Sequence, residues 1–376
     1  MKKILAAILV ATFFLGSNVA LAQNNEPKKA KAKNVQIKTK KPISDKERKL
    51  LEELYPKGKP SSAVDATTKF VLPATGTEVG VSEGGNRYAI VIGMANYPGT
   101  TYDLCVSDAK TELSDPIEGL SLYCKDDDSY HMKEALINEY GFSAENVHWL
   151  ADAKATRTSI KSAVDAVIEK AEAGDEIIFF FSGHGFTGEY GEASTDDKDL
   201  DNVDEAIAVY DEAYPTDEAI SAENSTDLDG YNYLASGSMI FDDELKSWFS
   251  DAKTDRISFI FDICGAGGMN DLAGEGRVLA MSSLEGQSSY TYYLGGTYTS
   301  DTIIQESQGL FSHYFVNRGM EDGLADGSNL LSKKNPAKWS GKVSIEEAFG
   351  YSYPIIKSVK PQTSILDDKF VNDLLP

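Results

Sequence analysis

This chain has few cysteines, few long apolar runs and a negative net charge, and each of these features excludes a class of protein. Three cysteines among 376 residues, at positions 105, 124 and 264, are too few and too scattered for a disulfide scaffold or a zinc cluster. The formal net charge of −23 argues against a nucleic-acid-binding surface and against a polybasic membrane patch. What is present, 41% hydrophobic and 25% charged residues, predicts a folded protein with a full core.

The N-terminus has the pattern of an export signal. Lys2 and Lys3 precede an apolar run over residues 4–16, and Ala20-Leu21-Ala22 supplies the small-x-small pattern of a signal peptidase site. The run is too short to span a bilayer, which takes about 20 residues. We therefore expect residues 1–22 to be a signal peptide and the mature chain to be periplasmic or secreted, from a bacterium; the alternative is a buried N-terminal helix.

Charge divides the rest of the chain. Residues 23–60 hold 12 Lys and Arg against 5 Asp and Glu, a net of +7, whereas residues 61–376 carry −32. A basic segment beside an acidic body is typical of a solvated linker or of a pro-segment that docks on the body. We define residues 23–84 as the basic arm, with one short helix expected over 43–55, and residues 85–376 as the main domain.

Apolar strands alternate with helices along the main domain. Short apolar runs at 88–92, 146–150 and 176–181 are typical of buried strands, and the segments 256–262 and 277–282 are strand-like. Helices are expected over 157–171, capped by Thr156, and around 243–250 and 310–316. This alternation predicts an α/β fold with a mostly parallel sheet covered on both faces.

Reactive side chains follow two of these strands. Phe-Ser-Gly-His-Gly at 181–185 contains His184, and Phe-Asp-Ile-Cys-Gly at 261–265 contains Cys264. A thiol needs a base to become a nucleophilic thiolate, and function in open α/β sheets gathers at the strands' carboxyl ends. The N–H groups of Gly185 and Cys264 could together stabilise an oxyanion. Taken singly, the cysteine also fits a small buried hydrophobe and the histidine a structural residue.

The motifs resemble those of the caspase-like cysteine peptidases, and among these are closest to the metacaspases of peptidase family C14. The similar segments run from about residue 87 to 362 and include L-C-V-S-D-A at 104–109, A-T-R-T-S-I at 155–160, F-S-G-H-G at 181–185, I-F-D-D-E-L at 240–245 and M-S-S-L-E-G-Q-S at 281–288. The resemblance implies a three-layer αβα sandwich around a mostly parallel central sheet, and a peptidase acting on peptides or proteins.

The resemblance also implies site residues. Cys264 is expected to be the nucleophile and His184 the general base. Asp262 and Asp108, bordered by Ser182, are expected to form a pocket for Arg or Lys at the cleaved position, since carboxylates pair with such cations. The two aspartates could instead cap a turn and a helix.

Calcium activation is a further implication of the resemblance. Four aspartates fall on the family's ligand positions, and carboxylate oxygens are what Ca²⁺ prefers: Asp204, Asp242, Asp243 and Asp271. No organic cofactor is expected.

Departures from the family pattern leave alternatives open. Gly265-Ala266-Gly267 stands where the family has His-Ser-Gly, and segments 115–128 and 189–230 have no counterpart and are expected to be surface loops or a lid. The rivals are therefore a non-catalytic caspase-like binding protein and an enzyme with another preference, such as Asn or Asp. A Lys- or Arg-specific peptidase could also cleave its own arm between Lys28 and Lys59.

Overall fold

The computed structural model describes residues 33–38, 40–54, 78–80, 84–97, 104, 121–189, 204–210, 239–298, 302–328, 341–370 and 373–376. The expected signal peptide, the candidate Asp108 and most of the segment 189–230 lie outside these residues. Within the described part of the chain, no helix has the length and apolar character needed to cross a membrane.

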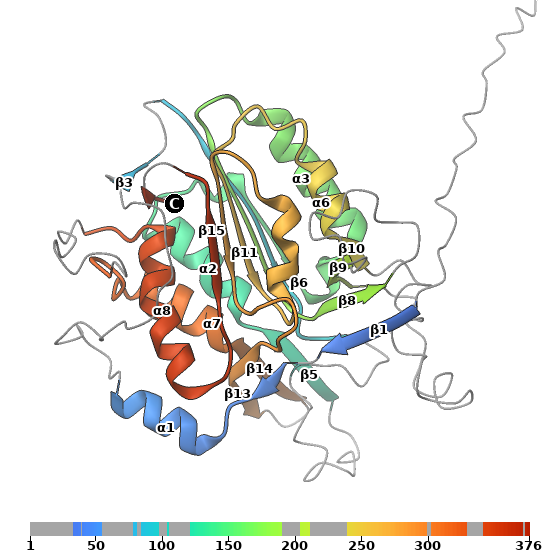
Figure 1. Ribbon diagram of the computed structural model, residues 1–376, viewed down its shortest axis with the longest axis vertical. Helices are drawn as coiled ribbons and strands as arrows, with labels where there is room; N and C mark the ends of the chain where they lie inside the picture. The colour runs from blue at the N-terminus through green and yellow to red at the C-terminus, as the bar shows by residue number, and fades with distance from the viewer. Residues whose placement is uncertain are drawn as a thin grey trace, which may run out of the picture.

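A six-stranded sheet forms the centre of the molecule (Figure 1). Its order is β15 (Ile365–Asp368), β12 (Arg277–Met281), β11 (Ile257–Asp262), β7 (Glu176–Ser182), β4 (Arg87–Gly93) and β6 (Val147–Ala151). All neighbours are parallel except β15, which runs antiparallel to β12. The five parallel strands are those that the sequence predicts; β7 and β11 are buried along their whole length because both faces of the sheet are covered, whereas the edge strand β6 is half-buried.

Helices cover the two faces of this sheet. On one side lie α3 (Arg157–Lys170) and α6 (Asp242–Trp248); on the other lie α2 (Asp128–Asn138), α7 (Leu310–Ser312), the π-helix η5 (His313–Glu321) and α8 (Ile345–Val359) (Figure 1). Short 3-10 turns lie at Ala144–Asn146, Asp152–Lys154 and Ala266–Leu272. This arrangement is the αβα sandwich that the sequence predicts.

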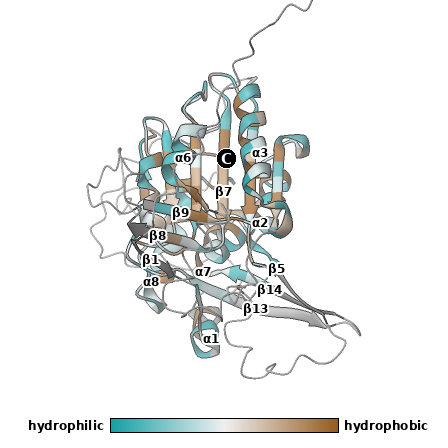
Figure 2. Ribbon diagram, turned by 90° about the vertical axis from the view of Figure 1, so that its right-hand side faces the viewer, coloured by the Kyte–Doolittle hydropathy of each residue, from teal (hydrophilic) through white to brown (hydrophobic). Residues whose placement is uncertain are grey.

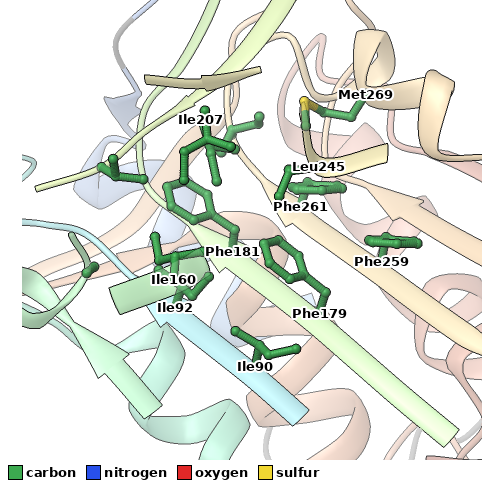
Figure 3. Close-up of a cluster of buried hydrophobic side chains, with 14 of the residues drawn as sticks. Ile90, Ile92, Ile160, Phe179, Phe181, Ile207, Leu245, Phe259, Phe261 and Met269 are labelled. Atoms are coloured by element: carbon green, nitrogen blue, oxygen red, sulfur yellow. The ribbon is translucent and has the colours of Figure 1, made fainter. Parts of the chain in front are cut away.

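Alternating side chains of the central strands form two cores. Phe179, Phe181, Phe259 and Phe261 face α3 and α6, packed with Met269 and others (Figure 3). The residues between them, such as Phe180, pack against α2, α7 and α8. Figure 2 shows the resulting brown strand β7 between helices that carry teal outer surfaces. The core holds the sheet rigid, so the ends of its strands are fixed in space.

Three smaller sheets complete the fold. The first has the order β1 (Lys33–Lys38), β8 (Gly185–Glu189), β9 (Asp204–Ala208) and β10 (Met239–Phe241). The second has the order β2 (Lys41–Pro42), β13 (Tyr290–Tyr298), β14 (Thr302–Gly309) and β5 (Ser121–Asp126). The third pairs β16 (Asp373–Leu374) with β3 (Glu78–Val79). The expectation of loops or a lid over 115–128 and 189–230 is therefore wrong at β5 and β9, which are paired strands.

The described part of the basic arm is built into the main domain. Its first strand, β1, pairs with β8, and its second, β2, pairs with β13. Helix α1 (Asp45–Leu54), which the sequence predicts, packs against α8 and buries Leu51 completely. A salt bridge of 2.8 Å joins Glu47 of α1 to Lys360, just beyond α8. The arm thus crosses the edge of the molecule where β7 and β11 end.

Candidate functional site

The carboxyl ends of β7 and β11 bring His184 and Cys264 onto neighbouring loops. Because Asp262 pairs with Ser182 in parallel register, the residues that follow them leave the sheet side by side. The Gly183 N–H donates to the Asp262 carbonyl at 3.3 Å. A Cβ at Gly185 would overlap the carbonyl oxygen of Cys264, so the close approach of the two loops requires glycine there.

Tyr97 holds the histidine loop from the other side. The backbone N–H of His184 donates to the Tyr97 hydroxyl at 2.8 Å, and the two ring centroids are 4.8 Å apart. Both residues are buried, Tyr97 completely. Tyr97 belongs to the segment that resembles the family, but the sequence analysis gave it no role in the site. Its contacts make it a positioning residue for the imidazole.

The Cys264 thiol is enclosed in this structure. The residue is 1% exposed, and the N–H of Ser289 donates to its Sγ at 3.3 Å. Burial raises the pKa of the Cys264 thiol to about 11, although the Ser289 hydrogen bond and the charge of Lys40 act in the opposite direction. At neutral pH the sulfur is therefore a thiol, which is a poor nucleophile.

An acidic pocket lies beside the cysteine, and Lys40 of the arm fills it. The Lys40 ammonium is 3.0 Å from the Asp262 carboxylate and donates to the Ser182 hydroxyl at 3.1 Å. Ser182 in turn donates to Asp128 at 2.5 Å. The side chains of Lys40 and Asp262 are 1% and 0% exposed, so the ion pair is fully desolvated.

Neighbouring groups fix the two carboxylates of the pocket. Asp262 accepts from the Ser289 hydroxyl at 2.7 Å and from the N–H and hydroxyl of Ser312 at 3.0 and 2.8 Å. Asp128 accepts from the N–H of Gly309 at 2.9 Å. Such bonds stabilise charged carboxylates away from water.

Gly309 leaves the room that the lysine occupies. A Cβ at Gly309 would overlap the Asp262 carboxylate and lie 3.0 Å from the Lys40 ammonium. Burial raises the pKa of Asp128 to about 7, with the Lys40 charge acting against the increase and the Asp262 charge adding to it. The pocket therefore binds a cation best when Asp128 has lost its proton.

The pocket contains Asp262 and Ser182, two of the three residues predicted for it, and a third residue that the sequence analysis missed. Asp108 lies outside the described residues. Asp128, the first residue of α2, takes the place beside Ser182 and Lys40. The sequence held a signal for Asp128: C-K-D-D-D-S-Y-H-M at 124–132 is an acidic run of the kind found at the start of a helix. The sequence analysis instead placed residues 115–128 in a surface loop or lid.

Two of the four predicted calcium ligands face one lysine ammonium in the described part of the chain. Asp243 and Asp271 both face the Lys246 ammonium, at 3.8 and 3.2 Å, while Asp242 is buried at the start of α6. The backbone of Asp204 begins β9, but its side chain lies outside the described residues. Among the described residues, no three His, Cys, Asp or Glu side chains are grouped as they would be around a metal ion. Since Lys246 already supplies the cation, the described carboxylates do not fit Ca²⁺ as they stand.

Comparison with known proteins identifies the family of this domain. The metacaspase peptidase C14 domain matches residues 87–273, which include both His184 and Cys264. Three Arabidopsis thaliana proteins are similar over shorter segments. Metacaspase-4 and Metacaspase-6 are each 30% identical over 139 residues, which is 35% of this chain and 28% and 31% of theirs. Metacaspase-9 is 30% identical over 108 residues, 26% of this chain and 27% of its own.

The chain thus matches less than a third of the length of these curated relatives. A solved structure of a Geobacter sulfurreducens protein aligns with 77% of this chain and 97% of its own, at 18% identity and a TM-score of 0.40. The matched segment and the αβα architecture lead to one assignment: residues 87–273 form a metacaspase peptidase C14 domain, of the cysteine peptidase class, that is distantly homologous to the plant metacaspases.

Proposed function

We propose that this protein is a cysteine endopeptidase that cleaves after Lys or Arg and is held inactive by its basic arm. One observation carries the proposal: a lysine ammonium occupies the pocket beside Cys264, bonded to Asp262 and Ser182. The pocket accepts a long cationic side chain, because carboxylates from β11 and α2 meet at its end. A substrate Lys or Arg would make the same contacts once the arm has left.

The chemistry of this proposal is acyl transfer to sulfur. His184 takes the proton of the Cys264 thiol, and the thiolate attacks the carbonyl carbon of the residue in the pocket. In this proposal the N–H groups of Gly185 and Cys264, which belong to the two touching loops, receive the developing oxyanion. The C–N bond breaks, His184 returns its proton to the departing nitrogen, and water then hydrolyses the thioester.

Latency follows from the same contacts. With the arm in place the pocket is filled and the Cys264 thiol has a pKa of about 11. Departure of the arm would open the pocket to the cationic side chain of a substrate. Export through residues 1–22 is part of the proposal and rests on the sequence alone. Calcium binding by Asp243 and Asp271 would require Lys246 to move away, and no step of this mechanism uses the ion.

The test is covalent labelling of the nucleophile. Peptidyl acyloxymethyl ketones ending in Arg, Lys, Asp or Asn are incubated with the folded full chain, with K40Q, which vacates the pocket, and with C264A. We expect the Arg and Lys reagents to add one label to K40Q, located at Cys264 by mass spectrometry, and none to C264A. Equal labelling by the Asp reagent would contradict the acidic pocket, and no labelling of folded K40Q would favour a non-catalytic binding protein.

A further inference from the structure

The direction of the arm through the site is set by its two strands. Upstream of Lys40, β1 runs antiparallel to β8, and its last residue, Lys38, pairs with Gly185, next to His184. Downstream of Lys40, β2 runs parallel to β13, with Lys41 opposite Tyr290. The arm's upstream half therefore lies on the histidine side of the site and its downstream half on the β13 side.

β13, which begins at Tyr290, starts next to the nucleophile. It is preceded by Ser289, whose N–H contacts the Cys264 sulfur at 3.3 Å. The parallel pairing continues past β2, because the N–H of Ile43 donates to the Thr291 carbonyl at 2.9 Å. After Lys40, the arm thus moves away from His184 as it proceeds.

Hydrolysis requires the opposite direction. In the proposed reaction the histidine must give its proton to the nitrogen that leaves, so the residue after the cleaved bond must lie on the histidine side. For cleavage after Lys40 the leaving nitrogen is that of Lys41, which lies along β13. A substrate with its acyl half along β13 and its leaving half near His184 would run antiparallel to β13, opposite to the arm.

We propose that the arm occupies the site in reverse, so that Lys40 fills the cation pocket while the Lys40–Lys41 bond is not presented for cleavage. This inference rests on the proposed function and specifies its regulation: Lys40 is an inhibitor residue, not a self-processing site. The arm gains pocket affinity from the buried Lys40–Asp262 pair without becoming a substrate.

Contacts downstream of the pocket hold the arm in this direction. Ile43 is 7% exposed and Leu51 0%, and both belong to the core that α8 and η5 complete. The Glu47–Lys360 salt bridge adds a polar contact, and hydrogen bonds from Ser44 and Lys360 lower the pKa of Glu47 to about 2 despite partial burial. These anchors make the downstream half the fixed end of the arm.

The experiment combines N-terminal mapping with peptide hydrolysis. Purified full chain, K40Q, K40A, the control K41Q one residue along the same segment, and C264A are incubated, and new N-termini are identified by labelling and mass spectrometry. Initial hydrolysis of a fluorogenic peptide ending in Lys is measured before any chain is cut, with thermal denaturation confirming that each variant is folded.

The inference predicts that wild type yields no product beginning at Lys41, and that K40Q or K40A hydrolyses the peptide at least ~10-fold faster than wild type, because a buried ion pair has been removed. K41Q should stay within about twofold of wild type, because it leaves the Lys40–Asp262 ion pair intact. A product beginning at Lys41 that accumulates in wild type but not in C264A would overturn the reversed direction while supporting the peptidase. Folded K40Q and K40A that hydrolyse nothing would overturn the proposed function, and the inference with it.

Discussion

Alkylation of Cys264 tests the latent state directly. The structure raises the pKa of this thiol to about 11 from an ordinary 9.0, because the residue is enclosed between the β11 loop and Ser289. At pH 8 a thiol of pKa 9 is roughly one-tenth thiolate, and one of pKa 11 roughly one-thousandth. Since only the thiolate reacts, iodoacetamide should modify Cys264 on the order of 100-fold more slowly in the native chain than in the urea-unfolded chain.

The assay resolves individual cysteines by peptide mass spectrometry, so that Cys105 and Cys124 do not contribute to the measured rate. The native rate is followed from pH 7 to the highest pH at which circular dichroism still shows the folded chain. The native alkylation rate should rise tenfold per pH unit with no plateau below pH 10, because the thiolate fraction rises tenfold per unit below the pKa. Restricted access of the reagent slows the reaction by the same factor at every pH and does not change this slope. A native thiol that reacts as fast as the unfolded one at pH 8, or whose rate levels off near pH 7, would refute the latent state.

Three further predictions concern the pocket and the core. In the K40Q background, G309A should raise KM for Lys peptides at least ~10-fold, since its Cβ would overlap the pocket carboxylate, whereas G286A, which has open space around it, should not; equal effects would refute the packing argument. In the same background D128N should lower kcat/KM for Lys peptides by about 10-fold or more by removing a buried charge; an unchanged kcat/KM would refute its place in the pocket. Burial raises the pKa of Glu176 to about 8, so between about pH 4.5 and 8 the folded chain keeps a proton that the unfolded chain loses, and stability falls as pH rises through that window. E176Q should therefore gain Tm over wild type at pH 8 but not at pH 5, as differential scanning fluorimetry would measure; a gain independent of pH would contradict this.

Local pattern was enough to predict the central sheet. The apolar runs that become β4, β6, β7, β11 and β12 need no tertiary information, because each is long, rich in β-branched or aromatic residues and bounded by turn or helix signals. The cap at Thr156 is likewise local: its hydroxyl accepts from the Ser159 N–H at 3.1 Å. The αβα fold was therefore predictable.

The accessory strands were not predictable in the same way. β5 pairs with β14 across about 180 residues of sequence, and β1 pairs with β8 across about 150, and periodicity within one segment carries no record of its partner. Asp128 was missed for this reason: only the pairing of β5 with β14 brings the start of α2 against Gly309. The reversed path of the arm likewise depends on strand register, which composition does not encode.

The charge pattern left a solvated linker and a docked segment both open. A net of +7 beside an acidic body fits either one, and the structure shows the docked one at Lys40, which pairs with Asp262. Among the arm lysines whose side chains the structure describes, Lys40 is the one that does so, and it is selected by its position between β1 and β2 rather than by its charge. The roles assigned to Cys264 and His184 stay predictions until activity is measured.

Peptide hydrolysis is the most direct test of the central claim, that the pocket of Asp262, Ser182 and Asp128 serves a cysteine peptidase specific for Lys and Arg. Fluorogenic peptides that differ only in their last residue, Lys, Arg, Asp or Asn, are given to the folded K40Q chain and to the same chain carrying C264A. The account predicts turnover of the Lys and Arg peptides alone, abolished by C264A. Turnover of Asp or Asn peptides, turnover that survives C264A, or a folded chain that cleaves none of the four would contradict it.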